Sequence, residues 1–336
     1  METEMKPMHV LIVGGAGYIG SHVVHEMIRA GHTVTVYDNL SHGDRANIPA
    51  GVAFVHGDLI DYARLRATLG DSEHRFDAVV HLAAFKAAGE SMVAPEKYAT
   101  NNICGTVNLL NVMCETEVKI LVFSSSAAVY GEPQYVPIDE KHPKEPENFY
   151  GFTKLEIERL MQWYDKLRGL RFAALRYFNA AGYDPSGAVS GLERNPANLL
   201  PIIMEAACGI RDKVTVFGTD YPTPDGTCIR DYVHVSDLAT AHVAAAAHLA
   251  DDGNSLAVNL GSESGISVFE MLEAARRITG RAIPSENGPR RPGDPAELVA
   301  SSAAAQELLG WQPRHSDVES LVRTSWTVYA PHEADA

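Results

Sequence analysis

Tyr150 and Lys154 are the side chains whose types and spacing point most directly to chemistry. They are four residues apart at the start of an amphipathic stretch, so a helix would place them on one face. A tyrosine with its ordinary pKa of about 10 is a poor base at neutral pH, but a nearby ammonium favours the phenolate. The pair therefore predicts proton transfer to and from a hydroxyl group, with Tyr150 as the base.

A run of three serines gives this pair a polar neighbour. Ser124, Ser125 and Ser126 close an apolar segment that predicts a strand over Lys119–Ser124. In a parallel sheet, ligands gather at the carboxyl ends of the strands. We therefore expect a serine hydroxyl there to bond to the same substrate oxygen that Tyr150 deprotonates.

A glycine-rich turn near the N-terminus predicts a dinucleotide site. Gly14, Gly17 and Gly20 mark a GxxGxxG pattern between a predicted strand over His9–Gly14 and a predicted helix over Ser21–Ala30. Such glycines allow a tight turn and let a pyrophosphate approach the backbone at the helix N-terminus. Asp38 ends the next strand, where a carboxylate binds the adenosine ribose and repels a 2′-phosphate, so NAD is favoured over NADP.

The elements that must position these residues alternate in type. Apolar strands are predicted over Thr33–Asp38, Ala53–His56, Ala78–Ala83 and Arg171–Arg176, and helices over Tyr98–Cys114 and Thr153–Leu167. This alternation predicts an α/β fold, a Rossmann-type doubly wound parallel sheet with a smaller α/β substrate lobe. We expect residues 1–178 and about 233–262 to form the NAD-binding domain, and about 179–232 with 263–336 the other lobe.

Composition narrows the function classes. The 336 residues are 46% hydrophobic, as in a folded globular protein, and no apolar run is long enough to span a bilayer. The formal charge of −15 disfavours a nucleic-acid surface. Because the four cysteines show no CxxC spacing, we expect neither a disulfide framework nor a metal site, and these features suggest the cytoplasm.

Longer segments carry a resemblance to a known family. They are Gly14–His22, Asp38–Ser41, HLAAFKAAGES (81–91), Asn101–Asn108, FSSSAAVYGEP (123–133), Tyr150–Lys154, LRYFNAAG (175–182), TVFGTDYPTPDGTCIRDYVHV (215–235) and PRRPGD (289–294). In these segments the chain resembles the UDP-glucose 4-epimerases of the extended short-chain dehydrogenase/reductase family, from about residue 8 to about residue 325. The resemblance implies inversion at C4 of a UDP-hexose through a transient 4-keto sugar, with NAD as the resident cofactor and a homodimer as the assembly.

The resemblance also implies roles for single residues. Ser126 and Tyr150 would carry the proton chemistry and contact the sugar, and Lys154 would tune Tyr150 and hold the cofactor. Positions that match NAD contacts, beside the three glycines, Tyr150 and Lys154, are Tyr18, Ile19, Asp38, Asn39, Asp58, Leu59, Leu82, Ala83, Lys86, Asn101, Ser124 and Tyr177. Positions that match nucleotide-sugar contacts are Phe178, Asn179, Asn198, Leu199, Thr215, Phe217, Arg230, Tyr232, Arg291, Asp294 and Leu298.

Two other interpretations differ from this one. A nucleotide-sugar dehydratase or decarboxylase would use the same fold, but a dehydratase would carry an acid–base pair after the strand-end hydroxyl, where this chain has Ala127. A non-enzymatic NAD-sensing protein would have no need of the Tyr150–Lys154 spacing. Leu298 bears on substrate width, because a small residue there would leave room for an N-acetyl group at C2 of the sugar.

Overall fold

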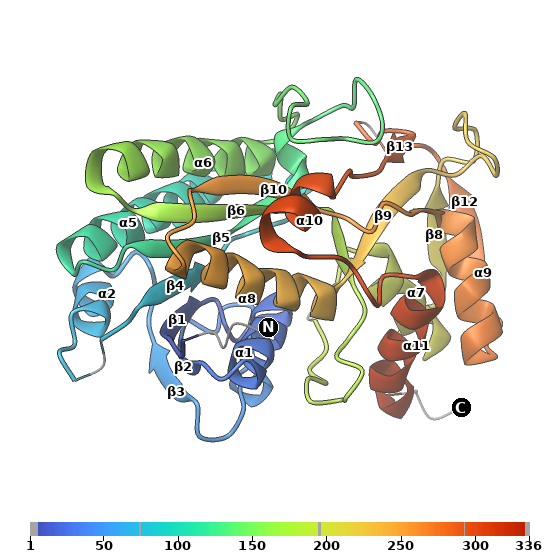
Figure 1. Ribbon diagram of the computed structural model, residues 1–336. Coiled ribbons are helices and arrows are strands. Elements are labelled where there is room, and N and C mark those ends of the chain that lie inside the picture. Colours follow the sequence, from blue (N-terminus) through green and yellow to red (C-terminus); the bar gives the residue numbers. More distant parts are fainter. Residues whose placement is uncertain (1–5, 74, 194–195, 292, 333–336) are drawn as a thin grey trace.

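Seven parallel strands form the central sheet of the computed structural model, which describes residues 6–73, 75–193, 196–291 and 293–332. The order across the sheet is β3, β2, β1, β4, β5, β6 and β10, as in a Rossmann fold (Figure 1). The strands are β1 (His9–Val13), β2 (Thr33–Asp38), β3 (Ala53–His56), β4 (Ala78–His81), β5 (Ile120–Ser126), β6 (Arg171–Tyr177) and β10 (Leu256–Leu260).

Helices cover both faces of this sheet, and the pattern of β1 explains why. Successive side chains of a strand point to opposite faces, and Val10 and Ile12 pack in one core while Leu11 and Val13 pack in another. The first core includes helices α1 (Tyr18–Arg29), α8 (Val235–Ala250) and α10 (Ala303–Leu309). The second includes α2 (Tyr62–Leu69), α5 (Gly105–Glu115) and α6 (Phe149–Arg168). Strands that are apolar on both faces are typical of buried parallel sheets.

The strand order creates the crevice that a ligand needs. From β1 the chain passes to β2 on one side, while β4 packs on the other side of β1. Connections that leave in opposite directions open a space above the carboxyl ends of the strands. The glycine turn, Asp38, Ser126 and Tyr177 all lie at or just beyond this edge.

A second lobe is built beyond β6 on smaller sheets. Strand β9 (Ile229–His234) pairs with β7 (Asn179–Ala181), β11 (Gly265–Ser267) and β13 (Glu297–Leu298), and β8 (Val214–Phe217) pairs with β12 (Ser285–Gly288). Helices α7 (Leu199–Ala207), α9 (Val268–Thr279) and α11 (Val318–Tyr329) enclose a third apolar core. Among the described residues, every helix is too short or too polar to cross a membrane.

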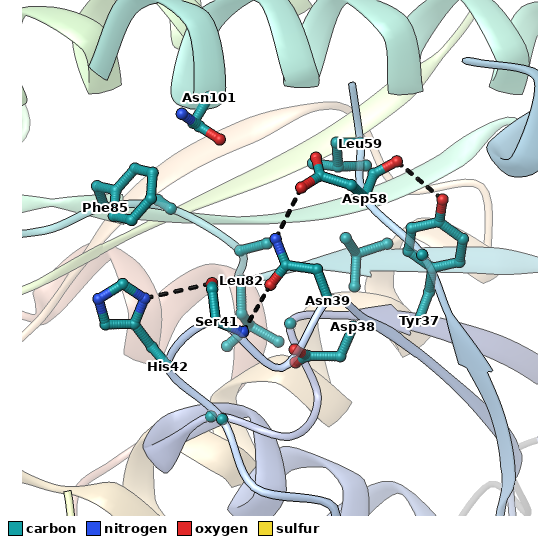
Figure 2. Close-up of a pocket in the computed structure, with 17 residues that line it drawn as sticks. Tyr37, Asp38, Asn39, Ser41, His42, Asp58, Leu59, Leu82, Phe85 and Asn101 are labelled. Carbon is teal, nitrogen blue, oxygen red and sulfur yellow. Dashed lines mark hydrogen bonds between the residues drawn. The ribbon is translucent and has the colours of Figure 1, made fainter. Parts of the chain in front are cut away.

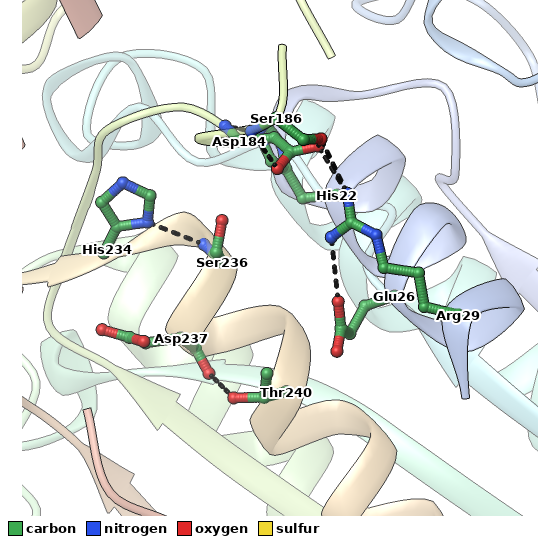
Figure 3. A network of polar contacts seen from close by, with 9 residues as sticks. All are labelled: His22, Glu26, Arg29, Asp184, Ser186, His234, Ser236, Asp237 and Thr240. Atoms are coloured by element: carbon green, nitrogen blue, oxygen red, sulfur yellow. Dashed lines mark hydrogen bonds and ion pairs between the residues drawn. The ribbon is translucent and has the colours of Figure 1, made fainter. Parts of the chain in front are cut away.

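Polar contacts tie this lobe to the first helix of the sheet domain. The Arg29 guanidinium pairs with Asp184 at 2.8 Å, and the Asp184 backbone N–H donates to Nε2 of His22 at 3.0 Å (Figure 3). The hydroxyl of Tyr18 also donates to the carbonyl oxygen of Gly182. Because these bonds join α1 to the segment after β7, the glycine turn is held at a fixed place relative to the second lobe.

One predicted helix is broken into three pieces. In place of a single helix over Tyr98–Cys114, the structure has α4 (Pro95–Tyr98), a π-helical segment over Ala99–Cys104, and α5. The side-chain amide of Asn102 in the π segment bonds both ways to the Phe85 backbone, at 3.0 Å each, which an exposed helix surface would not need. Single π turns are frequent at functional sites, and this one brings Asn101 to the crevice.

Candidate active site

A pocket lies above the carboxyl ends of β1, β2, β3 and β4 (Figure 2). Nine residues predicted to bind NAD line it, together with Tyr37, Ser41, His42 and Phe85, among others. The nine are Gly14, Gly17, Asp38, Asn39, Asp58, Leu59, Leu82, Ala83 and Asn101. Residues that are far apart in the sequence therefore meet in one crevice, as the strand order requires.

The glycine turn leaves space for a ligand at one position and is closed at another. A Cβ on Gly20 would overlap the carbonyl oxygen of Gly14, so helix α1 packs against the turn only because this residue is glycine. A Cβ on Gly17 would meet the nearest atom only at 3.5 Å, and Gly17 lines the pocket. The backbone at Gly17 is thus bare toward the crevice, as close approach of a pyrophosphate demands.

Asp38 links the turn to the end of β2. Its carboxylate accepts bonds from the backbone N–H groups of Ala16 at 2.9 Å and Leu40 at 2.7 Å. Beside it, the Asn39 amide donates to Asp58 at 2.8 Å (Figure 2). Two carboxylates and an amide at this end of the pocket suit the hydroxyl groups of a ribose and disfavour an added phosphate. On these observations the pocket fits NAD.

Tyr150, Lys154 and Ser126 meet next to this crevice, at the end of β5. Asn148 caps α6 by accepting from the Gly151 backbone N–H at 2.9 Å, so the helix begins at Phe149 and both Tyr150 and Lys154 face the sheet. The Ser126 hydroxyl lies near the Tyr150 phenol and acts to lower its pKa. The Lys154 ammonium donates to the carbonyl oxygen of Ser124 at 2.6 Å and lies 5.8 Å from the centre of the Tyr150 ring.

Burial dominates the acid–base behaviour of this group. Desolvation raises the pKa of Tyr150, and the hydrogen bond from Ser126 works against that rise. Desolvation also lowers the pKa of Lys154 to about 7, although the charge of Glu158 opposes it. The sequence argument expects the ammonium to favour the phenolate, whereas here the burial of both groups has the larger effect. Because the pKa of Lys154 lies near neutrality, nearby charges decide whether its side chain is protonated at neutral pH.

A second pocket opens on the far side of β6, where β7 leads into the second lobe. The predicted nucleotide-sugar residues Asn179, Asn198, Leu199, Thr215, Phe217, Arg230, Tyr232, Arg291 and Asp294 line it. Helix α7 begins at Leu199, so its N-terminus adds bare N–H groups and the positive end of its dipole. The Arg291 guanidinium stacks on Phe217 at 4.0 Å, and Arg230 pairs with Asp294. This pocket suits an aromatic base joined to a diphosphate.

Other predicted residues lie outside the two pocket walls. Ile19 and Gly20 belong to α1, Tyr18 bonds to Gly182, and exposed Lys86 pairs with Glu193. The buried Tyr177 bonds through its hydroxyl to His242. Phe178 packs in the main core, and Leu298 is partly buried against the same core while it pairs with Arg230 across β13 and β9.

Sequence reasoning missed several residues of the two pockets. Phe85 lines the first pocket, and Arg211, Lys213 and Cys228 line the second. The positive charge of Arg211 and Lys213 is the one signal that a search for phosphate-binding residues would have found. Sequence reasoning also missed Glu158 and Arg176, which form a buried ion pair next to Lys154.

The chain matches known proteins over nearly its whole length. A model of the NAD dependent epimerase/dehydratase family matches residues 10–261. A UDP-glucose 4-epimerase of Halalkalibacterium halodurans is 47% identical over 97% of this chain and 96% of its own. The crystal structure of UDP-glucose 4-epimerase from Brucella ovis in complex with NAD superposes with a TM-score of 0.93 at 44% identity, covering 96% of this chain and 98% of that one. The structure of UDP-glucose 4-epimerase from Bifidobacterium longum, in complex with NAD+ and UDP, gives a TM-score of 0.89 at 36% identity, covering 97% and 100%. With a family model that spans most of its length, and with these relatives, the chain belongs to the NAD-dependent epimerase/dehydratase family.

Proposed function

We propose that the protein interconverts UDP-glucose and UDP-galactose by inverting C4 of the hexose. The observation that carries this proposal is the position of Tyr150, Ser126 and Lys154 at the ends of β5 and α6, beside a dinucleotide crevice and a pocket built for a nucleoside diphosphate. Relatives named UDP-glucose 4-epimerase at 42–47% identity support it.

The cofactor would lie along the first pocket. Gly14, Gly17, Tyr18, Ile19 and Gly20 would hold its pyrophosphate, and Asp38, Asn39, Asp58, Leu59, Leu82, Ala83 and Asn101 would enclose its adenosine side. Lys86, Ser124, Lys154 and Tyr177 would contact the nicotinamide side. Held there, the cofactor would supply hydride transfer: acceptance of a hydride from C4 and its return to the opposite face of the 4-keto sugar.

The chain itself supplies the proton chemistry and the anchoring of the substrate. Tyr150 removes the proton of the 4-hydroxyl group and later returns it, while Ser126 bonds to the same oxygen and Lys154 sustains the charge of the phenolate. Asn179, Asn198, Leu199, Thr215, Phe217, Arg230, Tyr232, Arg291 and Asp294 keep UDP in place while the keto sugar turns over, and Phe178 supports them from the core. Fixed placement of the reacting groups accounts for much of the acceleration.

Product analysis tests the reaction. Proton NMR of UDP-galactose mixed with the purified protein should show UDP-glucose without added cofactor, because NAD is regenerated in each turnover. Tyr150→Phe keeps the ring but removes the proton acceptor, and should lower kcat by about 10²–10⁴-fold. UDP binding by calorimetry should be unchanged in this variant. A 6-deoxy-4-keto sugar or a pentose as product would overturn the proposal, and near-full activity of Tyr150→Phe would overturn the assignment of the base.

The glycine turn offers a matched pair of variants for cofactor binding. Gly17→Ala finds room in the fold but places a methyl group in the crevice, so the protein should fold normally and lose NAD(H). A misfit of about 1–3 kcal/mol corresponds to roughly 5–150-fold weaker binding. Gly20→Ala overlaps Gly14 and should lower the melting temperature as well. Nicotinamide released on denaturation reports the occupancy, and a Gly17→Ala protein that kept full occupancy would argue against this crevice as the cofactor site.

We further propose that Leu298 borders the sugar and restricts the substrate to plain hexoses. A branched side chain fills the space that an N-acetyl group at C2 would take, and misfitting bulk costs about 1–3 kcal/mol, or roughly 5–150-fold in kcat/KM. Leu298→Ser should therefore raise the rate on UDP-N-acetylglucosamine relative to UDP-glucose. If the unmutated protein uses both sugars with equal efficiency, Leu298 serves only to pack against the core.

We propose a homodimer, joined through the outer surfaces of α5 and α6. Apolar residues recur along α6 at Ile157, Leu160, Met161, Tyr164 and Leu167. Ile157 and Met161 are buried in the chain's own core, whereas Leu167 and the neighbouring Trp163 are 65% and 57% exposed. These two side chains line a groove between α5 and α6. Light scattering should give the mass of two chains, and Trp163→Glu should shift it toward that of one; the mass of one chain for the unmutated protein would refute the dimer.

We also propose that the protein acts in the cytoplasm, consistent with four cysteines, all among the described residues, that form no disulfide.

We propose that the chain divides into two lobes. Residues 1–178 with about 233–262 would form the NAD-binding domain, and about 179–232 with 263–336 would form the other lobe.

A further inference from the structure

Three residues of α6 each have a polar partner among the last three residues of β5. Tyr150, Lys154 and Glu158 follow one another at intervals of four and share one face of the helix. Their partners are the three consecutive serines: Ser126 lies near Tyr150, the Ser124 carbonyl oxygen accepts from Lys154 at 2.6 Å, and the Ser125 hydroxyl donates to Glu158 at 2.6 Å. Glu158 is therefore the third member of a row whose first two members carry the proposed chemistry.

Glu158 is held on its other side by Arg176 of β6. The guanidinium donates through Nε at 3.0 Å and through Nη2 at 2.6 Å, one bond to each carboxylate oxygen. Its Nη1 donates to the Tyr130 hydroxyl at 2.9 Å, and that hydroxyl donates to Asn259 at 2.6 Å. Arg176 is the register partner of Ser125, so two adjacent strands fix the carboxylate from the sheet side.

These groups are withdrawn from water. The exposed fractions are 1% for Ser125, 2% for Lys154, 2% for Glu158 and 4% for Arg176. A buried ion pair loses so much hydration that well-packed apolar residues often serve stability as well. Its location next to a buried ammonium thus suggests a use beyond holding the fold together.

We propose that Glu158 is a positioning residue for the reaction: gripped by Arg176 and Ser125, it fixes α6 against the end of β5 and supplies the negative charge that keeps the Lys154 side chain an ammonium. This inference rests on the proposed function for its catalytic consequence. Its electrostatic part concerns Lys154 alone and is measured without substrate.

The other described groups that face Lys154 are neutral or positive, so they do not supply the negative charge. From α6 it is faced by Tyr150, from β4 by His81, and from β5 by the Phe123 ring, 4.7 Å away, and the Ser124 carbonyl. Burial, and then the charge of Lys154, lower the pKa of His81 to about 3, so His81 is neutral at working pH. From β6, the Arg176 guanidinium reaches the same helix face and is positive. Among these described groups, Glu158 is the one carboxylate.

The signs of the expected shifts separate this role from a merely structural one. Glu158→Gln removes the negative charge and leaves Arg176 uncompensated, so the pKa of Lys154 falls and its ammonium is lost at a lower pH. The alkaline limb of the kcat–pH profile should move down by about one pH unit or more. Arg176→Met removes the positive charge instead and should move the same limb up. Glu158→Asp keeps the charge and should restore the wild-type limb at reduced kcat.

Lys154 is titrated directly by NMR of protein with ¹³C-labelled lysine, using the Cε signal that disappears in Lys154→Met. Asp237→Asn is the matched control, because Asp237 lies on α8, away from Lys154, and is also 2% exposed. Its carboxylate accepts bonds from the His315 backbone N–H and the Ser316 hydroxyl. This substitution should lower the melting temperature and leave the Lys154 titration in place. If a single variant fails to fold, Glu158→Gln combined with Arg176→Met leaves neither partner of the ion pair behind as an unpaired charge, and should still titrate Lys154 below the wild-type pH.

Three results would overturn the proposal: a Lys154 titration in Glu158→Gln at the wild-type pH, shifts of the same sign in Glu158→Gln and Arg176→Met, or a kcat loss that only follows the folded fraction. Failure of the unmutated protein to interconvert the two UDP-sugars would sink the proposed function while the NMR titration still decided the charge role of Glu158.

Discussion

The polar residues around the active site depend on one interaction, the burial of the Lys154 ammonium. A cation with 2% of its surface exposed has lost nearly all its hydration, so fixed dipoles and an opposite charge must stabilise it in place of water. The Ser124 carbonyl oxygen provides the dipole and Glu158 the charge. Because Glu158 is itself buried, its charge needs a buried partner, which is Arg176. Arg176 in turn donates to the Tyr130 hydroxyl, and that hydroxyl donates to Asn259. One functional cation thus accounts for a chain of polar residues that ends on β10.

That chain is possible only because β5 and β6 are neighbours in a fixed register. Ser125 faces Arg176 and Ser126 faces Tyr177 across the two strands. A shift of β6 by one residue would turn Arg176 to the opposite face, away from α6 and Glu158. The apolar residues of both strands prevent such a shift, since they fill cores on both faces of the sheet. The packing of the sheet therefore determines where the proton chemistry takes place.

The sequence predicts the repetitive parts of this molecule well, and the reason is physical. Strands β2 and β3 begin and end at the predicted residues, because each is a short run rich in β-branched or apolar residues that closes on a polar residue, Asp38 or His56. The start of α6 was placed too late, at Thr153, because the capping role of Asn148 depends on one side-chain bond. The glycine turn and the Tyr150–Lys154 spacing are local patterns, so the sequence alone is enough to find them. Glu158 and Arg176 were not singled out, since nothing local tells a buried pair from two surface charges on a helix and a strand.

The two pockets depend on long-range contacts in different degrees. The crevice at the glycine turn is assembled from strand ends within the first half of the sheet, and nine of the residues predicted for it line it. The second pocket draws on β7, α7, β8, β9 and the segment around Arg291, which are brought together by the third core and by Asp231. The buried Asp231 carboxylate accepts backbone bonds from Ser262, Glu263 and Ala300, and so joins β9 to the segment that carries Asp294 and Leu298. Arg230 and Tyr232 flank Asp231 on β9, so the same carboxylate that joins these segments also fixes the strand that carries two residues of the second pocket. A lobe with short strands and long connections needs such a tie, because its small sheets alone bury too little surface to hold these segments together.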